Sequence, residues 1–359
     1  MVKQGGTHRR GEQGMTSSSP SPAWFVPTLE TLLARRDLPA VQMCQMMHDL
    51  LNGSCGEVET AALLTALHAK GETADELAAA ASVLREYCLP LAAGRDDVLD
   101  TCGTGGDGSR TFNISTATAF VAAAVGVPVV KHGNRAVSSR SGSADVLTAL
   151  GVRVELDAAR ARTCLDRTGM AFCLAPLFHP RMARIGEVRK RLGVRTLFNC
   201  LGPLANPAGA AYQLLGVGRV EWLDCLAAAL IRLGTRRAIL VCGRDGLDEV
   251  SLSGPTLVRE VTAGQTIAHE WTPDDFGLAP CQIEELRVEG PDESAAVIRA
   301  VFRGEEGAPR RVVLANTAAA LMAAERVASL REGVKQAAAA IADGRAWNVL
   351  NELIVQSNS

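Results

Sequence analysis

Two glycine-rich polar loops lie close together between residues 100 and 151, and both contain residue types that bind phosphate groups. The first loop contains Gly103, Gly105, Gly106 and Gly108. Glycine allows positive φ angles and a close approach of the backbone, so several amide N–H groups can point at one anion. This loop therefore predicts a site that binds phosphate oxygens through the main chain.

The second loop follows a short apolar run and adds positive charge and hydrogen-bond donors. It contains Lys131, His132, Asn134 and Arg135, followed by Ser138, Ser139, Ser141 and Ser143. Cationic side chains neutralise phosphate charge, and hydroxyl and amide groups orient it. Together the two loops predict a pocket for a phosphorylated ligand.

The first loop lacks the GxxxxGK[ST] pattern of P-loop proteins, so an ordinary ATPase is not supported. The letters GTGGDG fit the GxGxxG spacing of dinucleotide-binding folds, but this spacing alone is weak evidence for an NAD enzyme. Instead, Asp107, Asn113, Ser115 and Thr116 supply oxygen atoms suited to a metal shell.

A helix is expected directly after the first loop. Asn113 is a suitable N-cap, and apolar residues recur at helical spacing at Ala117, Phe120, Val121 and Ala124. The positive end of this helix would point back at the loop and favour an anion there.

The rest of the chain divides into a helical part and an alternating part. Residues 29–91 have a helical pattern, with a helix start near Thr73 and Asp75. Beyond residue 98, the apolar runs 127–130, 171–174, 238–241 and 312–314 predict buried strands that alternate with helices. We therefore expect an α/β protein with a small N-terminal helical domain and a larger α/β domain that has a mostly parallel central sheet.

Domain boundaries follow from this division. Residues 1–26 are polar and rich in Gly, Ser and Pro, and they predict a disordered tail. Residues 27–95 form the expected helical domain and residues 96–355 the expected α/β domain. Residues 181–192 again have a charged helical pattern.

Composition excludes several classes of protein. The chain has 359 residues, 47% of them apolar, and no charge-free run of eighteen apolar residues, so no membrane partner is expected. The formal net charge of −2 does not predict a dedicated nucleic-acid binder. The ten cysteines are scattered without a CxxC pair, which favours reduced thiols in the cytoplasm over disulfides or zinc.

Several motifs resemble those of one family. GTGGDG, TFNIST and KHGNRAVSSRSGSADVL, all within residues 103–147, resemble the signature loops of the anthranilate phosphoribosyltransferases. Further motifs of this family follow at its spacing: KGET at 70–73, FHPRM at 178–182, VRKRLGVRTLFNCLGPLANP at 188–207 and GRDGLDEVSLSGPT at 243–256. The resemblance extends from about Leu29 to the C-terminus.

The resemblance implies a fold of the nucleoside phosphorylase/phosphoribosyltransferase type, in which a helical segment near residues 180–200 returns to the helical domain. It also implies a pentosyl transfer of tryptophan biosynthesis. The phosphoribosyl group of 5-phosphoribosyl 1-pyrophosphate moves to the amine of anthranilate, and pyrophosphate is released. The implied assembly is a homodimer through the helical domain.

Substrate-binding residues are carried over from the family motifs. The implied ligands of phosphoribosyl pyrophosphate are Gly103, Gly106, Asp107, Thr111, Asn113, Ser115, Thr116, Lys131 and Ser143. The implied anthranilate site consists of Gly103, His132, Asn134, Arg189 and Gly202, with His179 and Met182 near its entrance. Arg189 can bind the carboxylate with two donors, and His132 would orient the amine. No general base is assigned, because an aniline amine is already a usable nucleophile.

Magnesium is the expected cofactor. Asp248 and Glu249 lie in a glycine-rich turn after an apolar run, where adjacent carboxylates can reach two metal ions. With Ser115 they form the expected ligand set for two magnesium ions per subunit, which would share the phosphates of the substrate.

The sequence departs from the family pattern at two positions, and two alternative functions have to be considered. Cys242 stands where the family commonly has histidine, and Arg181 where a small residue is frequent, which could alter acceptor entry or rate.

A pyrimidine nucleoside phosphorylase would have a different second motif and no need for the two adjacent carboxylates. A nucleic-acid-binding relative would lack Asn134 or Arg189, and both are present.

Overall fold

The computed structural model describes residues 21–136 and 141–359. Most of the tail expected at residues 1–26 lies outside the described residues, and so do Ser138 and Ser139 of the second loop. The first helix begins at Phe25, within the segment assigned to the tail.

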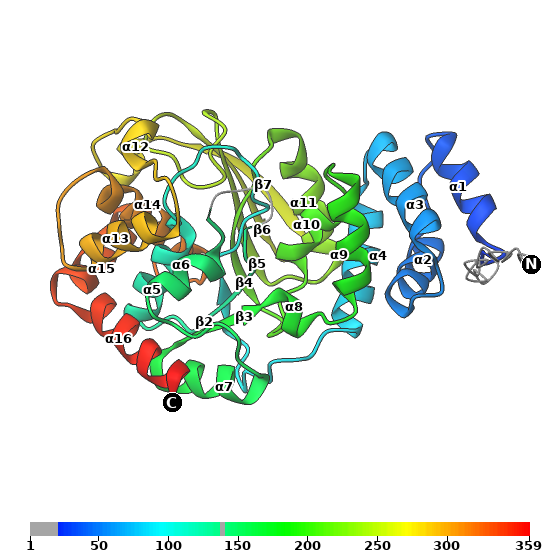
Figure 1. Ribbon diagram of the computed structural model, residues 1–359. Coiled ribbons are helices and arrows are strands. Elements are labelled where there is room, and N and C mark those ends of the chain that lie inside the picture. The colour runs from blue at the N-terminus through cyan, green and yellow to red at the C-terminus, as the bar shows by residue number, and fades with distance from the viewer. Residues whose placement is uncertain (1–20, 137–140) are drawn as a thin grey trace, which may run out of the picture.

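A helical bundle forms one end of the molecule (Figure 1). It contains α1 (Phe25–Leu33), α2 (Ala40–Asn52), α3 (Glu57–Lys70) and α4 (Ala74–Glu86). Helix α4 begins where the sequence predicts, because the Thr73 hydroxyl accepts a hydrogen bond from the Glu76 N–H while the Glu76 carboxylate accepts one from the Thr73 N–H. The predicted helical character of residues 29–91 is therefore confirmed.

Later segments of the chain pack against this bundle. Helix α9 (Met182–Leu192) contacts α2 and α3, whereas α10 (Phe198–Leu204) and α11 (Leu223–Arg232) contact α4. Helix α9 ends at Gly193, whose φ of 65° is the left-handed conformation that favours glycine. The interface between bundle and sheet is thus built from segments far apart in the sequence.

The larger part of the molecule surrounds one seven-stranded sheet in the order β3-β2-β1-β4-β5-β6-β7. Strands β1 to β5 pair in parallel, whereas β6 and β7 are antiparallel additions at one edge. The strands are β1 (Leu99–Asp100), β2 (Val129–Gly133), β3 (Met170–Leu174), β4 (Tyr212–Gly216), β5 (Arg237–Gly243), β6 (Thr256–Thr262) and β7 (Gln265–Trp271).

Helices cover both faces of this sheet. The remaining elements are α5 (Ile114–Ala124), α6 (Ser143–Ala149), α7 (Ala158–Thr168), α8 (Ala175–Phe178), η1 (Val220–Trp222), α12 (Pro273–Phe276), η2 (Ile283–Leu286), α13 (Pro291–Phe302), α14 (Ala308–Ala323), α15 (Leu330–Ala342) and α16 (Arg345–Asn358). The described helices do not include one with the length and apolar content needed to cross a bilayer.

One of the four predicted strands is wrong. Strands β2, β3 and β5 occupy the predicted apolar runs with shifted ends, but residues 312–314 lie inside helix α14. This helix packs against α5, α15, β4 and β5, so twelve of its sixteen residues are buried and none is exposed. A short apolar run does not by itself distinguish a buried helix from a buried strand.

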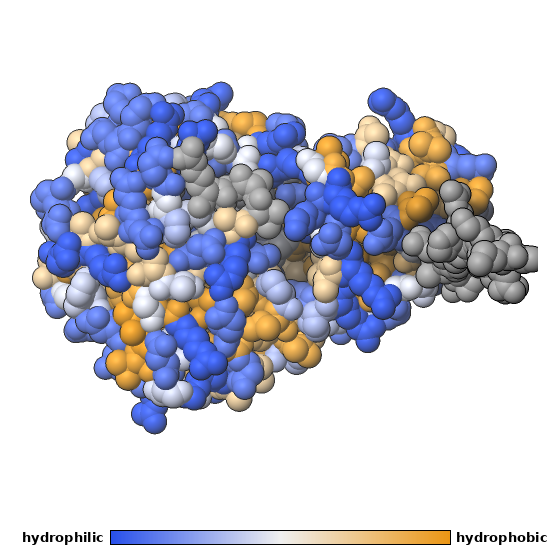
Figure 2. All heavy atoms as spheres, in the orientation of Figure 1, coloured by the Kyte–Doolittle hydropathy of each residue, from blue (hydrophilic) through white to orange (hydrophobic). Residues whose placement is uncertain are grey.

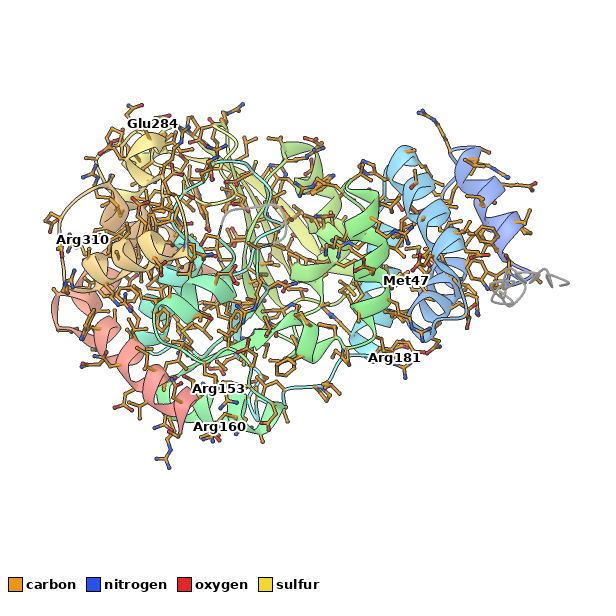
Figure 3. The ribbon with its side chains drawn as sticks, viewed as in Figure 1. Met47, Arg153, Arg160, Arg181, Glu284 and Arg310 are labelled. Atoms are coloured by element: carbon orange, nitrogen blue, oxygen red, sulfur yellow. The ribbon has the colours of Figure 1, made fainter. Side chains whose placement is uncertain are left out.

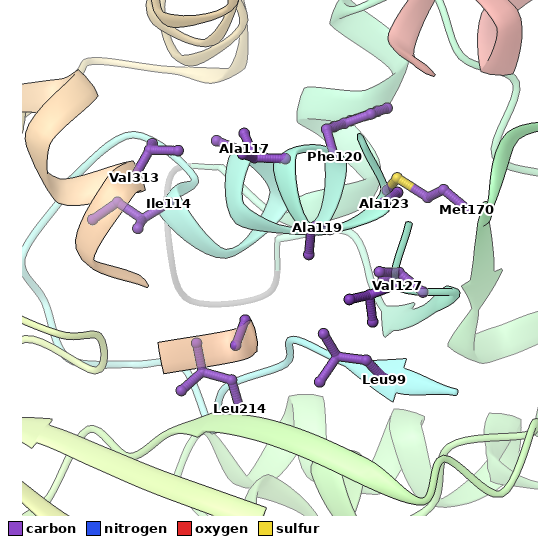
Figure 4. Close-up of a cluster of buried hydrophobic side chains, with 14 of the residues drawn as sticks. Leu99, Ile114, Ala117, Ala119, Phe120, Ala123, Val127, Met170, Leu214 and Val313 are labelled. Atoms are coloured by element: carbon purple, nitrogen blue, oxygen red, sulfur yellow. The ribbon is translucent and has the colours of Figure 1, made fainter. Parts of the chain in front are cut away.

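Helix α5 is the centre of the larger core and carries the glycine-rich loop at its N-terminus. Figure 4 shows Ala117, Ala119 and Phe120 of α5 among apolar side chains that include Leu99 of β1 and Val313 of α14. Each of these five residues is fully or almost fully buried. The helix that follows the loop is therefore fixed by packing along most of its length.

Candidate active site

The loops singled out in the sequence meet at one edge of the sheet. The carboxyl ends of parallel strands lie at the same edge, and ligands of α/β proteins bind there. The glycine loop (residues 101–113) follows β1, the second loop follows β2, and a turn at residues 244–250 follows β5. The Thr104 N–H donates to the Gly216 carbonyl at the end of β4, at 2.8 Å, which ties the glycine loop to the neighbouring strand.

The glycine loop has the backbone conformation that its composition predicts. Gly105, Gly106 and Gly108 have φ angles of 64°, 73° and 74°. The loop leads into α5, where the Asn113 side chain accepts a hydrogen bond from the Thr116 N–H at 3.0 Å. The predicted N-cap is confirmed, and the positive end of α5 adjoins the loop.

Lys131 lies beneath the glycine loop and is only 2% exposed. Its Nζ donates to the Thr101 carbonyl at 2.5 Å and to the Ser115 hydroxyl at 3.0 Å. Burial lowers the pKa of Lys131, while the nearby Asp100 carboxylate acts in the opposite direction. The ammonium is therefore held in place by groups from both ends of the loop.

Carboxylates from two segments meet at the same place. The Gly105 N–H donates to Asp248 Oδ2 at 3.0 Å, and burial together with Asp107 raises the pKa of Asp248 to about 7. Burial and Asp248 also raise the pKa of Glu249, against the opposing charge of Lys131. The buried Oδ2 of Asp107 has no hydrogen-bond partner among the described residues. This accumulation of oxygen ligands and negative charge fits a hard divalent cation.

The described residues contain no group of three His, Cys, Asp or Glu side chains arranged to hold a metal ion. Mg²⁺ is commonly bound by one or two carboxylates together with water and substrate phosphates, so this partial ligand set fits magnesium.

Two histidines near the end of α10 present unused acceptor atoms. The His132 Nδ1 bonds the Gly202 carbonyl and the His179 Nε2 bonds the Ala205 carbonyl, both at 3.0 Å. Since a carbonyl only accepts, these nitrogens carry the protons. The buried His132 Nε2 and His179 Nδ1 have no partner among the described residues, and the ring centroids are 5.1 Å apart. Both free nitrogens can accept an N–H.

Burial, followed by His179, lowers the pKa of His132 from 6.5 to about 3. The unfolded chain takes up this proton as the pH falls below 6.5 and the folded protein does not, so stability falls in acid. Below pH 6.5, this group is expected to lower the free energy of unfolding by up to about 1.4 kcal/mol for each pH unit.

We predict that His132→Asn makes the midpoint of urea unfolding less sensitive to pH between 6.5 and 5. His68→Asn, on an exposed histidine, is the control, and equal pH slopes in the two variants would contradict the prediction.

Arg189 on α9 has a guanidinium without a carboxylate partner among the described residues. Its Nη2 lies 3.5 Å from Asn199 Oδ1, and the group lies over the ring of Phe198, 5.4 Å from the centroid. Burial lowers the pKa of Arg189, although an arginine stays charged at any working pH. A partly buried, unpaired guanidinium is suited to bind the carboxylate of a ligand.

The other expected site residues are less closely connected. Ser143 begins α6 and its hydroxyl donates to the Asn134 carbonyl at 3.4 Å, whereas the Thr111 hydroxyl lies 3.4 Å from that of Ser109. Thr116 is fully buried, and its hydroxyl has no hydrogen-bond partner among the described residues. The described contacts do not join Asn134 to Arg189 or to the carboxylates.

Among the described residues, neither departure from the family pattern forms a hydrogen bond with Asp248 or Glu249. Cys242 is buried within β5. The Arg181 guanidinium lies over the Tyr87 ring, 4.4 Å from its centroid, and donates to Asn52. Figure 3 shows Arg181 at the boundary between the bundle and the sheet domain.

Sequence reasoning missed two residues that support the site, Asp100 and Arg195. Asp100 is fully buried and accepts hydrogen bonds from Asn206 Nδ2 at 2.7 Å and from the His132 N–H at 3.3 Å. Arg195 contacts the glycine loop. A carboxylate placed directly before a glycine-rich loop was the available signal for Asp100, whereas Arg195 had none.

The fold and the site define a class of protein. The helical bundle domain of a glycosyl transferase family matches residues 26–88, and the a/b domain of a glycosyl transferase family matches residues 95–347. The anthranilate phosphoribosyltransferase of Chloroflexus aggregans is 48% identical over 331 residues, which cover 92% of this chain and 97% of the relative. The chain therefore belongs to the anthranilate phosphoribosyltransferase family.

Solved structures agree with this assignment. The anthranilate phosphoribosyltransferase of Thermus thermophilus has a TM-score of 0.87 at 42% identity, over 92% of this chain and 99% of that one. The enzyme of Saccharomyces cerevisiae, solved in complex with PRPP and Mg, also has a TM-score of 0.87, at 28% identity, over 94% and 99% of the two chains.

Proposed function

We propose that the protein transfers the phosphoribosyl group of 5-phosphoribosyl 1-pyrophosphate to the amine of anthranilate. The products are N-(5-phosphoribosyl)anthranilate and pyrophosphate, and the reaction is the second step of tryptophan biosynthesis from chorismate. One observation carries the proposal: the glycine loop, Lys131 and the Asp248–Glu249 pair converge at one edge of the sheet. The yeast structure with PRPP and Mg supports the choice of donor.

The donor site works by charge and alignment. Pyrophosphate leaves with several negative charges while the ribose carbon gains positive charge, so fixed donors and cations lower the barrier more than proton transfer does. Loop amides and the N-terminus of α5 are fixed donors, and Lys131 is a fixed charge. The proposed donor ligands are Gly103, Gly106, Asp107, Thr111, Asn113, Ser115, Thr116, Lys131 and Ser143.

Ser115, Asp248 and Glu249 are the proposed ligands of two magnesium ions per subunit. Magnesium supplies positive charge that stabilises the departing pyrophosphate. The Ser115 hydroxyl adjoins Lys131, and the Asp248 carboxylate adjoins Gly105 of the glycine loop. The ligand set therefore borders the loop that is proposed to bind the same phosphates.

The acceptor site combines a fixed cation with fixed hydrogen-bond acceptors. Arg189 binds the carboxylate of anthranilate through two parallel donors. The neutral His132 accepts one amine N–H at Nε2 and so aims the nitrogen lone pair, because Gly202 fixes its tautomer. His132 orients the amine and removes no proton. Gly103 and Asn134 complete the proposed anthranilate site.

Assembly and location are further parts of the proposal. A homodimer through the helical domain is supported by exposed apolar residues on α1, α2 and α3, namely Val26, Leu33, Val41 and Val58. Figure 2 shows apolar atoms at the surface of this end of the molecule. Sedimentation as a monomer at micromolar concentration would contradict the dimer.

All ten cysteines lie within the described residues and none forms a disulfide, which supports the proposal that the protein is located in the cytoplasm.

The proposed domain limits are a tail at residues 1–26, of which Phe25 and Val26 lie in α1, a helical domain at 27–95 and an α/β domain at 96–355.

The alternatives are not favoured. A nucleic-acid-binding relative would lack Asn134 or Arg189, both of which are present, and the net charge is −2. A pyrimidine nucleoside phosphorylase has no need for the buried Asp248 and Glu249.

The proposed activity has a direct optical test. We expect anthranilate fluorescence to fall when purified protein, phosphoribosyl pyrophosphate and Mg²⁺ are mixed, and to stay constant when EDTA is present. Release of one pyrophosphate for each anthranilate consumed is the accompanying chemical measurement. Constant fluorescence with all three components present would overturn the proposal.

A further inference from the structure

Arg195 connects the segment between α9 and α10 to the glycine loop. Its Nη1 donates to the Gly106 carbonyl and its Nη2 to the Gly105 carbonyl, both at 3.1 Å. A guanidinium presents parallel donors in a rigid fork, so one side chain holds two consecutive peptide groups. Neither the donor site nor the acceptor site described above includes this residue.

An aromatic ring holds the guanidinium in place. Arg195 lies over the indole of Trp222, 4.9 Å from the ring centroid, and Arg219 lies 5.5 Å from the same ring. The Nε of Arg195 is buried and has no partner among the described residues. Hence the position of the fork is set by the Trp222 ring and the loop carbonyls rather than by a carboxylate.

The two bonds fix the direction of the loop amides. In a trans peptide the C=O and the following N–H point in opposite directions. Since the Gly105 and Gly106 carbonyls face Arg195, the N–H groups of Gly106 and Asp107 face away from it. Neither N–H donates to a protein acceptor within residues 21–136 and 141–359. Both remain available to an external anion.

Close packing makes this arrangement specific. A Cβ atom at Gly106 would meet Nη1 of Arg195, so the loop backbone and the guanidinium lie in close contact, and the φ of 73° at Gly106 favours glycine there. The Gly105 N–H is held from the other side by Asp248 Oδ2 at 3.0 Å. The peptide groups around Gly105 are thus fixed by Arg195 on one side and by Asp248 on the other.

We propose that Arg195 is a positioning residue that aims the Gly106 and Asp107 N–H groups at the pyrophosphate of the donor. The proposal rests on the proposed function and adds a residue to its donor site. Arg195 acts through the glycine loop and does not touch substrate. Its loss should therefore weaken donor binding and leave anthranilate binding unchanged.

Arg195→Met removes the fork and keeps the unbranched stem, and Arg219→Met is the matched control on the other arginine of Trp222. For Arg195→Met we expect the KM for phosphoribosyl pyrophosphate and the calorimetric Kd for magnesium pyrophosphate each to rise about tenfold, the size of one or two lost hydrogen bonds. The KM for anthranilate should stay within about twofold, and Arg219→Met should match the wild type.

Arg195→Lys keeps the charge without the fork and serves as the second variant if Arg195→Met fails to fold. We expect it to retain the defect in donor binding. Wild-type affinity for magnesium pyrophosphate in either Arg195 variant, or equal increases in both KM values, would overturn the positioning role. A wild-type protein that neither binds magnesium pyrophosphate nor consumes anthranilate would instead overturn the proposed function.

Discussion

The double variant Asp248→Asn, Glu249→Gln is expected to lose turnover by a factor on the order of a thousand, because the charge of the departing pyrophosphate goes uncompensated. Burial raises the pKa of both carboxyl groups, which means that their negative charges are unfavourable unless a cation lies beside them. The neutral amides keep the shape and remove the charge. The magnesium concentration that gives half-maximal rate should also rise, and a magnesium titration of the initial rate measures both effects.

The chain offers a matched control for this variant. Asp292 and Glu293 are also adjacent and lie exposed in the first turn of α13. Asp292→Asn, Glu293→Gln makes the same two chemical changes outside the site and should keep the wild-type rate and magnesium dependence. An unchanged magnesium titration for the Asp248 and Glu249 variant would refute the ligand assignment.

Replacement of Arg189 by methionine is expected to raise the KM for anthranilate about thirtyfold and to leave the KM for phosphoribosyl pyrophosphate nearly unchanged. The loss corresponds to about 2 kcal/mol, the usual size of a charge-assisted hydrogen bond to a carboxylate. Arg189 has no carboxylate partner among the described residues, so its removal breaks no internal ion pair. Initial rates over a grid of both substrate concentrations separate the two constants.

Arg191→Met is the control on the same helix. Arg191 is exposed and bonds Glu57 of α3 rather than a residue near the loops. It should leave both KM values at the wild-type level, apart from any loss of stability seen in thermal unfolding. Equal increases in the two KM values of Arg189→Met would show that Arg189 supports the fold of the site instead of binding anthranilate.

Local chemistry allowed much of the site to be predicted from the sequence. The side chains of Asn113 and Thr73 cap helices by bonding a backbone N–H three residues further along the chain. A short stretch of sequence is therefore enough to predict their role. Positive φ angles in the glycine loop are likewise a property of glycine itself. The placement of Asp248 beside Gly105 required the family motifs, because the two residues are distant in sequence.

Features determined by tertiary packing were missed. Residues 312–314 lie in helix α14, which has no exposed residue, so a short-range apolar pattern does not distinguish it from a buried strand. Strands β1 and β4 were not predicted. The β6–β7 hairpin was also missed, although Ala263 and Gly264, with φ of 41° and 82°, form its turn. Arg195 looks like any surface arginine until the glycine loop is placed beside it.

The short strand β1 also has a consequence for how the protein folds. Leu99 pairs with Val129 on one side and with Tyr212 on the other, so the centre of the sheet joins segments widely separated along the chain. Pairings of this kind form slowly, because a long loop must close before any contact compensates for the lost chain entropy. On the ribosome, β1 has no partner on its β4 side until residue 212 has emerged. The glycine loop, which starts where β1 ends, therefore cannot reach its final position before the chain has been made as far as β4.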